Sequence, residues 1–143
     1  MLGAHGVAAL VPALRHAQCR LAWLDLGFNE LGANGVMAGL VPALQHAHCR
    51  LTALGLAGQR RLTAAGAAAL VPALRHAQCR LTKLDLARNG LGAQGVAALV
   101  PALRHAQCRL AWLDLGFNEL GANGVMAGLV PALPHAQCRL WPL

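Results

Sequence analysis

Leucines recur along this chain in a pattern that changes its period within each block of about 30 residues. Over residues 81–86, leucines are spaced by polar residues, as in a short strand that buries one face. Asn89 follows, and from Gly95 to Leu103 apolar residues recur at helical spacing. The pattern therefore predicts one strand and one helix per block, in that order.

The block is repeated along the whole chain. A half block covers residues 2–20, complete blocks cover 21–50, 51–80, 81–109 and 110–139, and residues 140–143 begin another. Strand and helix in constant order predict a parallel sheet with helices on its outer side. Strands stack about 4.8 Å apart, whereas helices need roughly 8–10 Å. We therefore predict a single domain, residues 1–143, folded as a curved α/β solenoid with its sheet on the concave face and its helices on the convex face.

Two features depart from a regular repeat. Each predicted helix contains a proline, which removes a hydrogen bond and kinks a helix interior, so we expect a late helix start or a bend there. These prolines are Pro12, Pro42, Pro72, Pro101 and Pro131. Block 51–80 is the weakest match, because Gly55 and Gln59 replace an aspartate and an asparagine and Arg60-Arg61 adds a residue.

Block 21–50 contains the motif Leu21-x-x-Leu24-x-Leu26-x-x-Asn29-x-Leu31-x-x-x-Gly35, continued by Leu40, Leu44 and Cys49. This motif resembles the ribonuclease-inhibitor-like leucine-rich repeat. The closing His-Ala-x-Cys turn is most similar to the repeats of NOD-like receptors, in which a proline stands at the position of Ala47. Activators of the Ran GTPase share the pattern. The resemblance implies a horseshoe for protein recognition, and a fragment of a NOD-like-receptor or Ran-activator-like regulatory protein is the alternative.

The outward-facing strand positions are the candidate protein-binding surface on the concave face. Tryptophan and arginine dominate interface energies when they fill a pocket, and large aromatics on an open sheet have no evident internal role. Alternatively, the tryptophans cover neighbouring strands and the phenylalanines fold into the core. The candidate residues are Trp23, Asp25, Phe28, Lys83, Asp85, Arg88, Trp112, Asp114 and Phe117.

Basic residues outnumber acidic ones by 12 to 5, which gives a net charge of +7. One arginine precedes each strand, and stacking should align these arginines in a ridge along one edge: Arg20, Arg50, Arg80, Arg109 and Arg139. We interpret the ridge as a solvated edge. Binding of an anion or a nucleic acid is an alternative, but no aromatic residues interleave with the arginines, which disfavours nucleic acid.

His-x-x-Cys also recurs once per block, from His16 and Cys19 to His135 and Cys138. Zinc would require ligands from two blocks, so we expect no metal, with cysteine as a small buried filler and histidine as a polar helix end. The regular aspartates stand without a nucleophile, and there is no phosphate loop or zinc-hydrolase motif. We therefore predict no enzymatic activity and no cofactor.

The five cysteines are odd in number and occupy equivalent positions, which favours reduced thiols and a cytoplasmic protein. No apolar run reaches the length of a membrane span, so we expect no membrane partner. Solenoid ends normally need polar caps, and the chain starts and stops within a block. We therefore expect self-association through the ends, beside the main partner, another protein.

Overall fold

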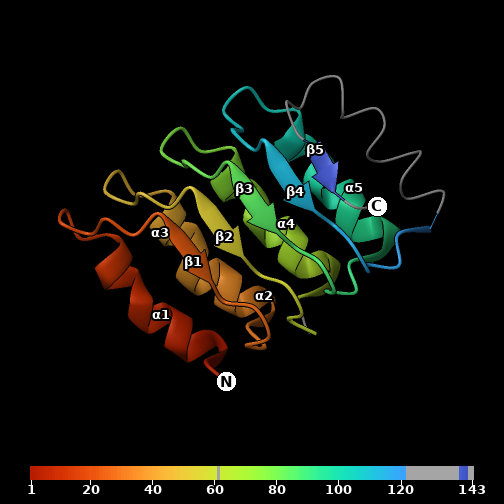
Figure 1. Cartoon of the computed structure of the whole chain (residues 1–143), viewed down its shortest axis with the longest axis horizontal. Coiled ribbons are helices and arrows are strands. Elements are labelled where there is room, and N and C mark those ends of the chain that lie inside the picture. The colour runs from red at the N-terminus through yellow and green to blue at the C-terminus, as the bar shows by residue number, and fades with distance from the viewer. Residues whose placement is uncertain (61, 122–138, 142–143) are drawn as a thin grey trace.

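The computed structural model describes residues 1–60, 62–121 and 139–141 of the chain, and within them strands and helices alternate (Figure 1). The strands are β1 (Trp23–Asp25), β2 (Ala53–Gly55), β3 (Lys83–Asp85), β4 (Trp112–Asp114) and β5 (Arg139–Trp141). The α-helices are α1 (Gly3–Leu14), α2 (Gly32–Gly35), α3 (Val41–Leu44), α4 (Thr63–Leu74) and α5 (Gly92–Leu103), with a π-helical segment η1 (Val36–Leu40) between α2 and α3.

The strands form one parallel sheet in the order β1-β2-β3-β4-β5, so each block adds its strand beside the preceding one. Trp23 pairs with Ala53, Ala53 with Lys83, and Lys83 with Trp112, which keeps equivalent positions in a row across the sheet. The helices line up along one side of the sheet, and its other side is open (Figure 1). The predicted α/β solenoid of repeats is confirmed.

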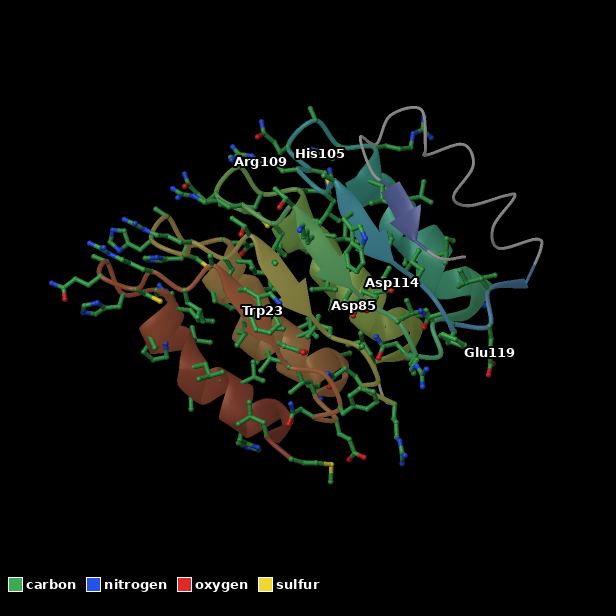
Figure 2. The ribbon with its side chains drawn as sticks, viewed as in Figure 1. Trp23, Asp85, His105, Arg109, Asp114 and Glu119 are labelled. Carbon is green, nitrogen blue, oxygen red and sulfur yellow. The ribbon has the colours of Figure 1, made fainter. Side chains whose placement is uncertain are left out.

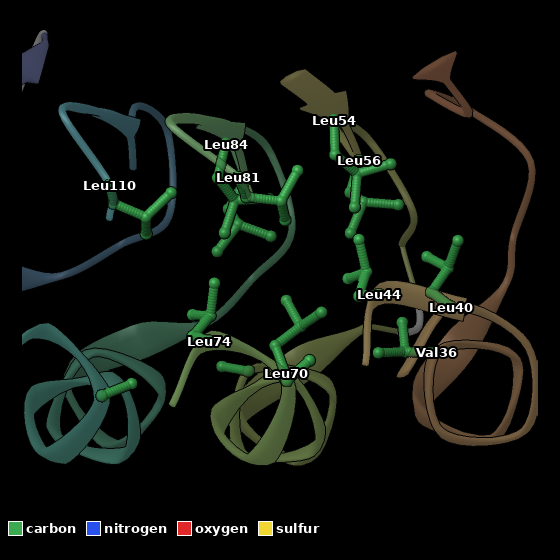
Figure 3. Packing of buried hydrophobic residues seen from close by; sticks show 14 of the residues in the cluster. Val36, Leu40, Leu44, Leu54, Leu56, Leu70, Leu74, Leu81, Leu84 and Leu110 are labelled. Atoms are coloured by element: carbon green, nitrogen blue, oxygen red, sulfur yellow. The ribbon is translucent and has the colours of Figure 1, made fainter. Parts of the chain in front are cut away.

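The core lies between the sheet and the helices, and it consists mainly of leucine (Figure 3). Leu54 and Leu84 point inward from the strands, and Leu40 and Leu70 meet them from the helices. All four side chains are at most 2% exposed. Because every block contributes the same leucines, the core continues from block to block, and burial of this apolar surface drives the stacking.

A ladder of side-chain amides joins consecutive blocks where each strand ends. Asn89 is 1% exposed, and its Oδ1 accepts a 2.7 Å hydrogen bond from the N–H of Gln59 in the preceding block. Its Nδ2 donates to the carbonyl oxygens of Leu56, at 2.8 Å, and Leu86, at 3.0 Å. Asn118 repeats the arrangement one block later and accepts from the N–H of Asn89 at 2.8 Å. These amides satisfy backbone groups that the short strands leave buried.

Gln59 occupies the asparagine position in block 51–80, and its side-chain amide also bonds to backbone groups of the preceding block. Its Oε1 accepts a 3.0 Å hydrogen bond from the N–H of Leu31, and its Nε2 donates to the carbonyl oxygen of Leu26. The side chain is fully buried. The block that matches the repeat least well therefore keeps the ladder intact.

Of the two alternatives for the prolines, a late helix start is wrong for three helices and fits only α3, which begins at Val41 beside Pro42, while a bend stays a prediction. Helices α1, α4 and α5 begin well before Pro12, Pro72 and Pro101 and continue through them. In each helix the residue four positions before the proline is exposed, so the carbonyl that loses its partner can bond to water. Only η1, just before Pro42, departs from α-helical hydrogen bonding in the part of the chain that the structure describes, and Pro131 lies outside that part.

The last strand departs from the repeat register. The repeat would pair Trp112 with Pro142, but Trp112 pairs instead with Arg139, three residues earlier. Proline has no N–H to donate to the neighbouring strand, which accounts for the shift. Arg139 consequently begins β5 rather than preceding it, and its place in the arginine ridge stays a prediction.

Candidate functional site

Two rows of side chains cross the open face of the sheet, because every second residue of a strand points to the same side. Trp23, Ala53, Lys83 and Trp112 form the first row, one residue from each of the strands β1 to β4. The second row consists of Asp25, Gly55, Asp85 and Asp114. Both rows are interrupted at β2, where the residues are small.

The interruption produces a recess of about 360 Å³ on the sheet face. Trp23 and Asp25 line one side of it, and Lys83, Asp85 and Trp112 line the other. Leu54 and Gly55 contribute the floor on β2. Trp23 is 63% exposed, whereas Trp112 is half-buried. Figure 2 shows Trp23 and Asp85 on the strands on either side of β2.

Gly55 leaves room over β2 for the carboxylate of Asp25. A Cβ atom at this position would lie 2.6 Å from Oδ1 of Asp25, so any side chain here would displace the carboxylate. The aspartate that the other blocks carry at this position is therefore replaced by a residue that lets Asp25 lean over β2. The recess thus depends on a departure from the repeat at Ala53 and Gly55.

The carboxylates of the second row are oriented by their own strand ends. Asp25 accepts a 2.8 Å hydrogen bond from the N–H of Gly27, and Asp85 accepts one of 2.9 Å from the N–H of Ala87. Asp114 accepts the equivalent bond from the N–H of Gly116 at 2.8 Å. Each bond uses only Oδ1, so the carboxylates are held in place with a second oxygen available for a ligand.

Asp85 is the carboxylate of this row whose pKa is raised. Partial burial raises the pKa of its carboxyl above the ordinary value of 3.8, and the negative charges of Asp114 and Asp25 raise it further. The hydrogen bond from Ala87 lowers the pKa and only partly offsets these effects. The charged form of Asp85 is therefore disfavoured in the folded protein, which is a common property of residues at functional sites.

We expect Asp85→Asn to raise the thermal unfolding midpoint at pH 7. Because the pKa of Asp85 is higher in the folded than in the unfolded chain, the folded state binds more protons between the two values. The Asp85 contribution to stability therefore falls as pH rises from about 4 through the folded pKa. Asparagine keeps the Oδ1 acceptor and removes this fall. Circular dichroism melts from pH 3 to pH 7 should show the midpoints converging in acid, and a less stable variant at pH 7 would contradict the explanation.

A third row lies in the loops that follow the strands. Phe28 and Phe117 are 66% and 75% exposed, so the alternative that the phenylalanines fold into the core is wrong. Both have left-handed backbone conformations, with φ of 58° and 56°. The Cζ atom of Arg88 lies 4.6 Å from the centre of the Phe117 ring, a cation–π contact. These residues border the sheet face and line no part of the recess.

The arginines of the helix-to-strand loops lie on the opposite edge of the sheet face from Glu119. Figure 2 shows Arg109 and His105 on this edge, far from the labelled Glu119. Four arginines of the predicted ridge are exposed: Arg20, Arg50, Arg80 and Arg109. The side chain of Arg139 lies outside the described residues.

The histidine and cysteine of each His-x-x-Cys motif form hydrogen bonds within the same helix-to-strand loops. The Nδ1 atom of His76 accepts a 3.2 Å hydrogen bond from the N–H of Gln78, and its carbonyl oxygen accepts a 3.0 Å bond from the N–H of Cys79. Cys49 and Cys79 are buried and unpaired, and burial raises the pKa of both thiols. His-x-x-Cys is thus a turn element in the described blocks. Within these blocks, no three possible metal ligands gather together, and no helix is long and apolar enough to span a membrane.

The sequence identified the walls of the recess but not its floor. Trp23, Asp25, Lys83, Asp85 and Trp112 were expected on the binding face, and the structure brings these five around one recess. Asp114 lies in the same row without lining it. Gly55 in the floor, and its neighbour Ala53 in the other row, were missed because they carry no chemistry of their own. The signal was their smallness at positions where neighbouring blocks place tryptophan and aspartate.

Comparison with known proteins identifies the repeat. A family model described as a leucine rich repeat matches residues 24–38, 78–100 and 113–127. These matches cover β3 and the last two residues of β1 and of β4, together with α2 and parts of η1 and α5. No curated protein matches the chain.

Proposed function

Because the chain is a leucine-rich-repeat protein, we propose that it is a non-catalytic module that binds another protein on the open face of its sheet. Leucine-rich repeats generally mediate protein–protein interaction. The observation that carries the proposal is the recess over β2, which has tryptophan and carboxylate walls. It is the place where the blocks differ most on an otherwise repetitive surface.

The energetics of the surface support this function. Trp23 leaves most of a large apolar side chain in water, an arrangement that favours covering by a partner. Asp85 is disfavoured in its charged form by burial and by two neighbouring carboxylates. Exposed apolar side chains and disfavoured charges lower stability, and such residues are typical of binding surfaces. The recess combines an apolar wall with oriented polar atoms, as protein-binding pockets do.

The finer family assignment and the cellular setting are also proposals. The His-x-x-Cys turn, with its repeated Nδ1 hydrogen bond, supports a relationship to the repeats of NOD-like receptors. A regulatory segment of such a protein, or of a Ran-activator-like protein, would use the same face. The free thiols of the described residues fit a reducing compartment such as the cytoplasm.

Filling the recess should abolish partner binding while leaving the fold intact. Ala53→Trp gives block 51–80 the tryptophan that blocks 21–50 and 110–139 carry at this position, so the sheet should tolerate it. Bait proteins are compared in a pull-down with quantitative mass spectrometry. We expect proteins retained by the wild type to fall at least about tenfold on the Ala53→Trp bait, because the buried centre of an interface dominates its energy.

The matched control is Ala97→Trp, which adds the same side chain at an exposed position on α5. This variant should retain the wild-type set of proteins, and circular dichroism should show the same helix content for all three baits. If Ala53→Trp retains the same proteins as Ala97→Trp, the sheet face is not the binding surface. The proposed function would then be wrong.

A further inference from the structure

The recess over β2 differs in charge from the rest of the molecule. The chain carries a net charge of +7, yet three of its five acidic residues, Asp25, Asp85 and Asp114, lie in one row on the sheet face. The carboxylates of Asp25 and Asp85 line the recess, and among the described residues Lys83 is the basic residue that lines it. A local negative charge within a basic protein favours a positively charged group of the partner.

The shape of the recess and its aromatic wall restrict further which positively charged group can bind there. Trp23 presents most of its indole to solvent beside the recess, and an indole face attracts a cation that lies over it. Arginine is the basic side chain suited to both walls, because its planar guanidinium stacks on aromatic rings and donates paired hydrogen bonds to carboxylates. The missing side chain at Gly55 leaves β2 low between the bulkier side chains of β1 and β3, and the carboxylate of Asp25 leans over it.

Building on the proposed function, we propose that the recess binds an arginine side chain of the partner protein. The guanidinium stacks against Trp23 and lies above Gly55, between the carboxylates of Asp25 and Asp85. Lys83 stands in the other row, where it pairs with Ala53 rather than with Gly55. Each Oδ1 accepts one backbone N–H, so a second lone pair of Oδ1 and both lone pairs of Oδ2 remain as acceptors for the guanidinium.

The electrostatics of the row fit this occupant. Burial raises the pKa of Asp85 most, and the negative charges of Asp114 and Asp25 raise it further, so the carboxylates of the row repel one another. A guanidinium between Asp25 and Asp85 would neutralise the repulsion that the folded protein otherwise retains. A neutral or acidic side chain in the same place would leave the repulsion or increase it.

The test uses acetyl-arginine amide as the probe and acetyl-citrulline amide, which has the same shape without the charge, as its control. The full chain is labelled with ¹⁵N, and the indole N–H signals of its three tryptophans are assigned from single Trp→Phe variants. We expect a saturable shift of the Trp23 signal, with an affinity for the arginine probe at least about tenfold higher than for citrulline. Equal affinities, or no saturable shift with arginine, would overturn the proposal.

Matched variants separate local contacts from net charge. The double variant Asp25→Asn/Asp85→Asn should bind the arginine probe no better than citrulline. The double variant Glu30→Gln/Glu119→Gln changes the net charge equally at loop residues that do not line the recess, and it should bind like the wild type. If both double variants lose affinity alike, general attraction explains the binding and the proposal fails. Because these titrations need no partner, their failure leaves the pull-down test of the sheet face unaffected.

Discussion

Replacing Asn89 with alanine is expected to lower the free energy of unfolding by about 3 kcal/mol, because it leaves two buried backbone groups without partners. The N–H of Gln59 loses its acceptor, and the carbonyl oxygen of Leu56 loses its donor. The carbonyl oxygen of Leu86 keeps the bond that Asn118 donates at 2.8 Å. A loss of this size is a large fraction of the roughly 5–15 kcal/mol that stabilises a typical domain. Urea unfolding followed by circular dichroism measures it.

Asn29→Ala is the control for this loss. Asn29 occupies the equivalent position at the edge of the ladder, where its Oδ1 accepts from the N–H of the exposed Leu2. Its Nδ2 donates to the carbonyl oxygen of Leu26, which also accepts from Gln59. Water or Gln59 can therefore replace what is lost, and we expect a cost below about 1 kcal/mol. Similar costs at both positions would show that burial of the ladder does not determine its contribution.

The repetitive part of this fold was predictable because the same sequence pattern recurs in every block. Leucine at two periods, with asparagine between them, determines strand, turn and helix in each block, and the same residues form the core. The sequence showed that Gln59 stands in place of an asparagine, but not that its longer side chain still bonds to the backbone of the preceding block, at Leu31 and Leu26. It also could not show that proline is tolerated within helices, because that depends on which carbonyls face water.

The candidate site was predictable only in part, and for the opposite reason. Tryptophan and aspartate at outward strand positions can be recognised in the sequence as candidate binding residues. A recess arises where side chains between them are small, which the sequence alone does not show. Ala53 and Gly55 acquire significance only when the register places them between Trp23 and Lys83. The shifted register of β5 likewise follows from a missing N–H at Pro142 rather than from the repeat. Departures from the repeat therefore determine both the recess and the end of the sheet.

The core prediction with the largest expected effect concerns Leu84 at the centre of the sheet. Leu84 is 0% exposed and lies on β3, which has a strand on each side. Leu84→Ala removes buried atoms from a core that packed neighbours on both sides prevent from collapsing. We expect a loss of about 2–5 kcal/mol in the free energy of unfolding, measured in urea at micromolar protein.

The same substitution at Leu24 tests whether the edge of the solenoid is open. Leu24 occupies the equivalent position on β1, where it is only half-buried and has a neighbouring strand on one side. Leu24→Ala should therefore cost less than half as much as Leu84→Ala, since less apolar surface leaves water there on folding. Equal costs would contradict the open edge and would mean that a second copy covers β1. In that case the wild-type unfolding midpoint would rise with protein concentration, because association stabilises the folded state by mass action.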